Sequence, residues 1–133
     1  MHLVGFHTGC LVALEMAKLS GKYGSITLVD VPYFDDVTKA KHRSQLDPNN
    51  PMHTAFFAAF DYDLEGALQT TSQEVTVIAT NSSLLEPTRK AAQVLVNAVF
   101  KERKDIYKPV FEQTAIAKFL LSIIFDNSQT LQL

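Results

Sequence analysis

The apolar positions of this chain form short continuous runs in some segments and repeat about every 3.6 residues in others. This pattern predicts strands and helices in alternation. Residues 1–6 form a short apolar strand, and residues 11–19 carry a stripe with the spacing of an amphipathic helix. Residues 25–31 are rich in β-branched side chains, as expected of a second buried strand. Residues 74–80 have the clearest strand pattern of the chain.

Residues 33–73 break this alternation. The pattern predicts a polar helix from about Asp35 to Leu46 and an aromatic-rich helical segment from Met52 towards Leu68. This segment is too long for a plain crossover between strands, so we expect a cap-like helical excursion over the top of the sheet. Its phenylalanines could line an acyl pocket in such a cap, but their helical spacing favours ordinary core packing. They are Phe56, Phe57 and Phe60.

The last third of the chain predicts one more helix, a weak strand and a final helix. Pro87 suits the first turn of a helix that runs through Ala91 to Val99. Residues 106–110 can form a fourth strand, and residues 111–125 a last helix. The tail after Asp126 is polar, and we expect it to be frayed.

Strands joined by helices imply a parallel sheet with right-handed crossovers. The predicted fold is therefore α/β, with a mainly parallel sheet of about four strands in sequential order and flanking helices. The chain has 133 residues, of which 47% are hydrophobic and 20% charged, as in a soluble globular protein. We expect residues 1–133 to form a single domain, with residues 33–73 as its cap-like excursion.

Charge and cysteine content exclude several classes of function. The formal net charge is −2 and no broad basic face is present, so a nucleic-acid partner is not expected. The one cysteine and the isolated histidines give no metal-ligand spacing, and nothing in the sequence indicates a cofactor. No apolar run approaches the roughly 18 residues that span a bilayer, and no signal peptide is recognisable, so we expect a cytoplasmic protein without a membrane partner.

The pentapeptide Gly5-Phe6-His7-Thr8-Gly9 lies between the first strand and the first helix. The order strand, Gly-x-nucleophile-x-Gly, helix is the layout of a nucleophile elbow, whose middle residue sits on a strained turn above a parallel sheet. The middle residue here is histidine, where serine would be expected. The pattern therefore predicts the architecture of the elbow but not its usual chemistry.

Through residues 2–17 the sequence resembles the α/β-hydrolase superfamily. The runs ending at Pro32 and at Pro87 also look like later strands of that fold. The resemblance covers nearly the whole chain but only about the second half of a complete hydrolase. The upstream strands and the loop that donates one oxyanion-hole hydrogen bond would lie before Met1, which suggests a fragment or a minimal derivative.

The resemblance does not carry over the catalytic residues of the superfamily. His7 takes the nucleophile position, and Ser83 matches the acid position, with Asn81 and Glu86 as nearby polar alternatives. The catalytic histidine should lie around residues 107–109, yet no histidine occurs beyond residue 53. Serine hydrolysis needs an activated hydroxyl, a base and a group that orients the base. A standard triad is therefore excluded for this chain.

His7 has three interpretations. It could bind or protonate a ligand at the carboxyl edge of the sheet, or form a transient covalent intermediate. Alternatively it is a relic, because histidine is enriched among residues with positive φ. The Thr8 N–H would point toward the former oxyanion hole, while its hydroxyl is expected to cap the helix. Cys10 could pair with His7, but a small buried apolar role is commoner at its position.

We therefore expect a non-catalytic ligand-binding derivative or fragment, with a small ester or acyl ligand near Thr8, Asn81, Ser83 and Glu86. One alternative is a weak hydrolase of small esters or acyl compounds that uses His7. Another is a homo-assembly module, because without upstream strands the first strand presents an unpaired edge that invites a homodimer.

Overall fold

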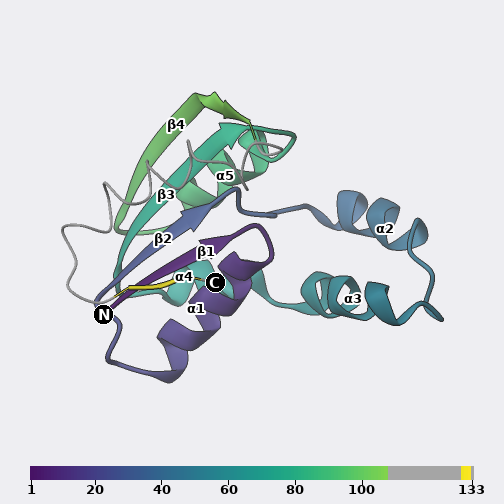
Figure 1. Cartoon of the computed structure of the whole chain (residues 1–133), viewed down its shortest axis with the longest axis horizontal. Helices are drawn as coiled ribbons and strands as arrows, with labels where there is room; N and C mark the ends of the chain where they lie inside the picture. Colours follow the sequence, from purple (N-terminus) through teal and green to yellow (C-terminus); the bar gives the residue numbers. More distant parts are fainter. Residues whose placement is uncertain (108–129, 133) are drawn as a thin grey trace.

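The structure is a computed structural model that describes residues 1–107 and 130–132. Strands and helices alternate, as the hydrophobic pattern predicts, and Figure 1 shows one twisted sheet with helices packed against it. The elements are, in order, β1 (His2–Phe6), α1 (Gly9–Leu19), β2 (Ser25–Val29), α2 (Asp36–Ser44), the 3-10 helix η1 (Pro51–His53), α3 (Thr54–Asp61), α4 (Leu64–Thr70), β3 (Glu74–Asn81), α5 (Leu85–Val94), β4 (Ala98–Tyr107) and β5 (Thr130–Gln132).

The described strands form one parallel sheet in the order β4-β3-β2-β1-β5. Residues His2 to Phe6 of β1 pair with Ser25 to Val29 of β2, so the two strands end side by side. Neighbouring parallel strands in sequential order require right-handed crossovers, which place the intervening helices on one face of the sheet. The carboxyl ends of β1, β2 and β3 therefore meet at one edge, where ligands bind in open α/β sheets.

Helix α1 packs on β1 and β2, and α5 packs on β3 and β4. Helix α4 contacts both α1 and α5, so the three helices lie side by side. The core between them and the sheet consists of apolar side chains from both layers, of which Leu3, Leu14, Ile26, Leu28, Leu68, Val75 and Val77 are at most 2% exposed. Burial of this apolar surface is the main stabilising contribution to the fold.

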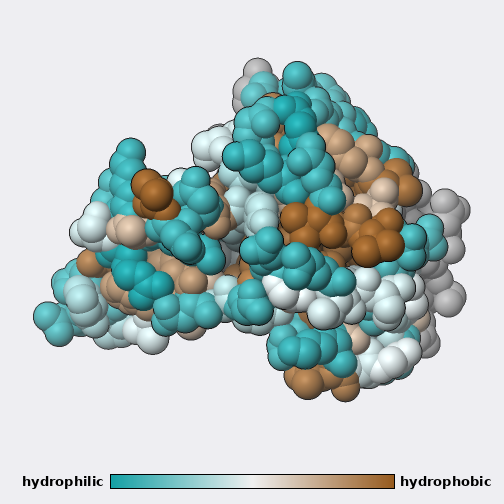
Figure 2. Space-filling model, turned by 180° about the vertical axis from the view of Figure 1, so that it is seen from behind, coloured by the Kyte–Doolittle hydropathy of each residue, from teal (hydrophilic) through white to brown (hydrophobic). Residues whose placement is uncertain are grey.

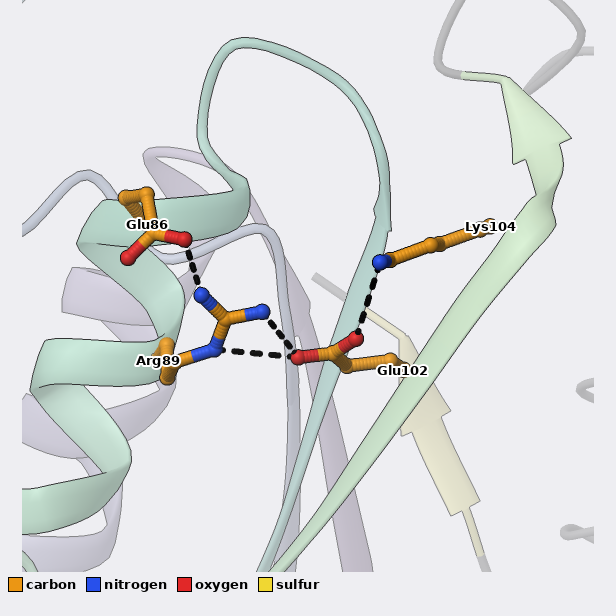
Figure 3. Close-up of polar contacts among 4 residues, drawn as sticks. All are labelled: Glu86, Arg89, Glu102 and Lys104. Carbon is orange, nitrogen blue, oxygen red and sulfur yellow. Dashed lines mark hydrogen bonds and ion pairs between the residues drawn. The ribbon is translucent and has the colours of Figure 1, made fainter.

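Arg89 connects α5 to the edge strand β4. Its guanidinium donates hydrogen bonds to Glu102 on β4 and to Glu86 one turn earlier on α5. Lys104 lies 3.6 Å from the second Glu102 oxygen, which completes the group of charges in Figure 3. Such charges on an edge strand also discourage pairing with another chain.

Helices α2 and α3 form a pair that projects outward from the carboxyl ends of the strands (Figure 1). We call residues 36–61 the arm. Asp35, just before the arm, caps α2 by accepting a hydrogen bond from the Thr38 amide at 2.7 Å. Arg43 of α2 forms an ion pair with Asp61 of α3 at 2.6 Å. Figure 2 shows the arm as a lobe with a mainly hydrophilic surface, beside the body of the molecule.

The helical segment expected from Met52 towards Leu68 is present but interrupted, and the expectation about its phenylalanines is wrong. The helical segment predicted from Met52 to Leu68 is divided into η1, α3 and α4, because Tyr62 is extended and Asp63 starts a new helix by accepting a hydrogen bond from the Gly66 amide. Core packing was also the favoured role for the three phenylalanines, yet α3 contains no buried residue. Their helical spacing gives α3 an apolar side, but that side lies outside the core of the sheet.

The C-terminal third also differs from the prediction. Helix α5 ends at Val94, and Ala98 and Val99 belong to β4, opposite Val75 and Thr76 of β3. The strand predicted over residues 106–110 therefore begins eight residues earlier, at Ala98. Pairing with a long buried strand outweighs the helical spacing of these alanines and valines. The predicted last helix over residues 111–125 lies outside the described residues.

The polar tail was expected to be frayed, but residues 130–132 form β5, which pairs with His2, Leu3 and Val4 of β1. Over these residues β1 is an interior strand, so the expectation of an unpaired first strand is wrong. The homodimer that rested on it stays a prediction without that support. No helix in the described part of the chain is long and apolar enough to cross a membrane.

Candidate functional site

The turn between β1 and α1 has the geometry of an elbow. His7 has a φ of 52°, in the left-handed region that non-glycine residues rarely adopt. Its amide donates to the Val29 carbonyl at 2.9 Å, which extends the pairing with β2, and its carbonyl accepts from the Cys10 amide at 3.0 Å, which starts α1. The chain therefore turns sharply from β1 into α1 at His7.

Gly5 makes this sharp turn possible. A Cβ atom at Gly5 would lie 2.6 Å from the Gly9 carbonyl oxygen and 2.8 Å from the Cys10 Cα. Both are backbone atoms of α1 and cannot rotate away. Helix α1 therefore approaches β1 more closely than any residue with a side chain would allow.

Cys10 is fully buried beneath the elbow. Its thiol lies 3.4 Å from both the Gly5 and the Val29 carbonyl oxygens, to which it can donate. Burial raises the pKa of the Cys10 thiol far above its usual range, so the thiolate is suppressed. The structural role assigned to Cys10 from the sequence fits this environment, and a Cys–His pair with His7 does not.

Thr8 occupies the position before the first residue of α1, but its hydroxyl makes no capping hydrogen bond. The expectation that this hydroxyl caps the helix is therefore wrong. The reason is geometric, because Thr8 already has helical φ and ψ angles of −62° and −25°, whereas a capping residue is normally extended.

A cavity of about 960 Å³ opens beside the elbow. The elbow, the loop after β2, the arm, the start of α4, and the loop from β3 into α5 bound it. Its aromatic and histidine lining consists of His7, Tyr33, Phe34, His42, Phe56, Phe60 and Tyr62. The lining also contains seven charged residues, which are Asp35, Asp36, Lys39, Asp63, Glu65, Glu86 and Lys90. A concave surface that combines apolar side chains with polar groups can hold a small molecule.

Three of the four ligand-binding residues predicted from the sequence line this cavity together with His7. They are Thr8, Ser83 and Glu86, which come from the elbow and from the segment after β3. The fourth, Asn81, is the last residue of β3 and is not part of the lining. The Glu86 carboxylate accepts a hydrogen bond from Arg89, so it is held on the α5 surface.

Sequence reasoning considered a pocket lined by the phenylalanines of the cap-like excursion but favoured core packing for them, and it did not anticipate His42. The His42 ring meets Phe34 edge to face, with centroids 4.9 Å apart, and lies 6.1 Å from the Phe60 centroid. Phe34 and His42 are eight residues apart, whereas Phe60 lies on α3 and is brought to His42 by the packing of α2 against α3. The helical spacing of Phe56 and Phe60 was the available signal, and it favoured a place in the core.

Two tyrosines at the inner end of the arm are tied to acids. The Tyr62 hydroxyl donates to Glu15 of α1 at 2.9 Å, which attaches the end of α3 to the body of the molecule. Burial and this hydrogen bond raise the pKa of Tyr62 well above its usual range. Burial and the nearby Glu65 carboxylate also raise the pKa of Tyr33. Both phenols are therefore neutral hydrogen-bonding groups near neutral pH.

The lining supplies hydroxyl, imidazole and carboxylate groups but not the order of a serine triad. His7 lies at the turn where the sequence predicts a nucleophile, and the chain has no histidine after residue 53. Within the described ranges, no group of three or more histidine, cysteine or acidic side chains is arranged to hold a metal ion. The described lining therefore does not present the serine, histidine and acid of a standard triad.

No family model matches this chain, and no curated protein matches its sequence. Solved structures do match its fold. The structure of Rv0554 from Mycobacterium tuberculosis aligns with a TM-score of 0.61 and 13% identity, covering 96% of this chain and 66% of that one. An alpha/beta hydrolase from Sphaerobacter thermophilus aligns with a TM-score of 0.57 and 14% identity, covering 91% of this chain and 66% of that one.

At these identities the similarity establishes the fold alone. The chain has an α/β-hydrolase fold and spans about two-thirds of the length of these structures. The predicted α/β architecture is thereby confirmed, and its fold is that of an α/β hydrolase.

Proposed function

We propose that the chain is a non-catalytic, ligand-binding derivative of the α/β-hydrolase fold. A small ester or acyl ligand would occupy the cavity between His7 and the arm. The observation that carries this proposal is the left-handed His7 at the elbow, which lines a cavity with three of the predicted ligand-binding residues. In this proposal the backbone turn at His7 is retained, but the serine hydroxyl that would act as the nucleophile is replaced by an imidazole.

The lining gives each part of such a ligand a suitable surface. Phe56 and Phe60 on the arm provide apolar area for an acyl chain. Thr8 immediately precedes α1 and Ser83 lies in the loop from β3 into α5, so hydroxyls and the helix amino terminus are available to a carbonyl oxygen. His7 would then contact the carbonyl group as a hydrogen-bond partner rather than attack it.

The alternative is a weak hydrolase in which His7 itself is the working residue. Histidine is an accepted covalent nucleophile and general base. Hydrolysis of 4-nitrophenyl butyrate by wild-type protein and by His7→Ala separates the two proposals. The binding proposal predicts equal rates for both, no faster than buffer. Turnover that disappears in His7→Ala would establish the alternative.

Binding itself is tested with N-(4-nitrophenyl)butanamide, the amide analogue of that ester, which resists hydrolysis. Phe60 and Phe57 provide a matched pair, because both lie on α3 and only Phe60 lines the cavity. Phe60→Ala should raise the dissociation constant about tenfold, since the ring buries apolar area against the ligand. Phe57→Ala should leave it within about twofold of wild type.

Equal losses in both variants would place the ligand elsewhere or show that the arm acts only through its folding. No measurable binding by wild type would contradict the proposed function.

A cytoplasmic location remains part of the proposal, supported by the single cysteine.

A further inference from the structure

Asp30 is the second residue of the described chain with a left-handed backbone, and the cavity lining does not include it. It follows β2 with a φ of 53°, and its amide donates to the Ile78 carbonyl of β3 at 3.0 Å. His7 makes the same contact one strand away, where its amide donates to Val29. Two neighbouring strands therefore end in the same way, yet only the His7 end is explained by an elbow.

The Asp30 side chain is buried, with 2% of its surface exposed. One carboxylate oxygen accepts from the Thr80 amide at 2.9 Å and the other from the Thr80 hydroxyl at 2.6 Å. The ion pairs of the described residues do not include Asp30. A buried carboxylate held by hydrogen bonds, without a cation, needs well-placed donors to remain in place.

The next residue continues this arrangement. The Val31 amide donates to the Thr88 hydroxyl of α5 at 2.9 Å, and Thr88 is fully buried. Asp30 and Val31 thus tie the end of β2 to the end of β3 and to α5 at once. We call these two residues with Thr80 and Thr88 the Asp30 clasp.

The three segments that meet at the Asp30 clasp form one side of the cavity. On the loop after β2, the lining residues Pro32 and Tyr33 follow the clasp. After β3, the lining residues Ser83 and Leu84 follow Thr80. On α5, the lining residues on either side of Thr88 are Glu86, Pro87 and Lys90. The clasp lies directly behind these lining residues.

We propose that Asp30 is a positioning residue for the candidate site. Its carboxylate, through Thr80, fixes the loop after β2 against the loop after β3, so that both present their side chains to one ligand. This inference rests on the proposed function. The left-handed backbone at Asp30 aims the carboxylate back across β3, and the hydrogen bonds to Thr80 hold it there.

The test compares two buried threonines of the sheet. Thr80→Val removes the hydroxyl of the clasp and Thr80→Ser keeps it. Thr27→Val is the matched control, because Thr27 is fully buried and shares a 2.8 Å hydrogen bond with His2, but does not line the cavity. Each variant is measured for affinity toward N-(4-nitrophenyl)butanamide and for its unfolding midpoint.

Thr80→Val should weaken binding about tenfold, and Thr80→Ser should stay within about twofold of wild type. Asp30→Ala removes the carboxylate and should weaken binding about as much as Thr80→Val, because both hydrogen bonds to Thr80 are lost. Thr27→Val should lower the unfolding midpoint without weakening binding. Equal affinity of folded Thr80→Val and wild type, or an equal loss in Thr27→Val, would overturn the proposal.

Amide hydrogen exchange keeps this test independent of the proposed ligand. The Tyr33 amide donates to the Val31 carbonyl and the Leu84 amide to the Ser82 hydroxyl, so both report the order of the two loops. Thr80→Val should speed exchange at both amides about tenfold more than Thr27→Val does at equal stability. If wild type fails to bind the probe, the proposed function fails, and unchanged exchange at these amides would overturn the clasp by itself.

Discussion

His7 combines a strained backbone conformation with a position beside the cavity. A left-handed backbone costs a residue with a Cβ about 1–2 kcal/mol, and glycine would avoid most of that cost. The structure nevertheless holds His7 at a φ of 52° beside a cavity. Backbone strain at a cavity is typical of binding and catalytic sites, and it motivates our reading of His7 as a ligand contact.

Gly5 gives a prediction at the same scale. Gly5→Ala should lower the free energy of unfolding by about 3 kcal/mol, because its Cβ would press on backbone atoms of Gly9 and Cys10. Gly21 is the matched control, since a Cβ there meets nothing within 4 Å. Gly21→Ala should leave the stability unchanged or raise it by about 0.5 kcal/mol. Urea denaturation measures both, and equal effects would show that the tight approach of α1 to β1 is not required.

At the scale of elements, the sequence predicted most of the sheet and little of the arm. Strands β1, β2 and β3 were recognisable because a strand buried on both faces leaves a continuous apolar run. Strand β4 was not, because its outer half consists of charged residues from Lys101 to Asp105 and its start has the spacing of a helix. Strand β5 has three residues, and its place beside β1 depends on contacts that no local pattern encodes.

The candidate site follows the same division. His7 could be identified because the elbow is a local motif, and Ser83 and Glu86 because they follow a clear strand. His42 and Phe60 could not be placed, since the pairing of α2 with α3 depends on contacts such as Arg43 with Asp61. The residues of local motifs could be predicted from the sequence, whereas the side of the cavity that the arm forms could not.

The pairing of β1 with β2 predicts a dependence of stability on pH. His2 is buried, and its ring nitrogens lie 2.5 Å from the Ser25 hydroxyl and 2.8 Å from the Thr27 hydroxyl. Burial, and then the charge of the chain's amino terminus, lower the pKa of His2 below its ordinary value of 6.5. As pH falls through that value, the unfolded chain binds a proton that the folded chain does not bind.

The unfolded state is therefore favoured, and stability should fall as pH drops below about 6.5. The stabilising contribution is fully present above that pH and is lost toward the lower pKa of the folded state. His2→Gln should flatten the profile of unfolding midpoint between about pH 5 and 7, because glutamine does not titrate. A profile as steep as that of wild type would show that other groups carry the pH dependence.

At the scale of the whole molecule, a sheet and three helices of an α/β-hydrolase fold support a cavity at the usual edge. The chain spans about two-thirds of the length of the solved structures that it resembles. The central claim is that this portion binds a small ester or acyl ligand beside His7 and does not hydrolyse it.

One titration tests both parts of that claim. Proton–nitrogen correlation spectra of labelled protein, recorded during addition of 4-nitrophenyl butyrate, report the binding site through amide shifts. One-dimensional proton spectra of the same samples report turnover through the signals of the ester and its products. The account predicts shifts at Thr8, Tyr33 and Ser83, with the ester consumed no faster than in buffer. Shifts confined to other parts of the chain, or ester loss proportional to the amount of protein, would contradict it.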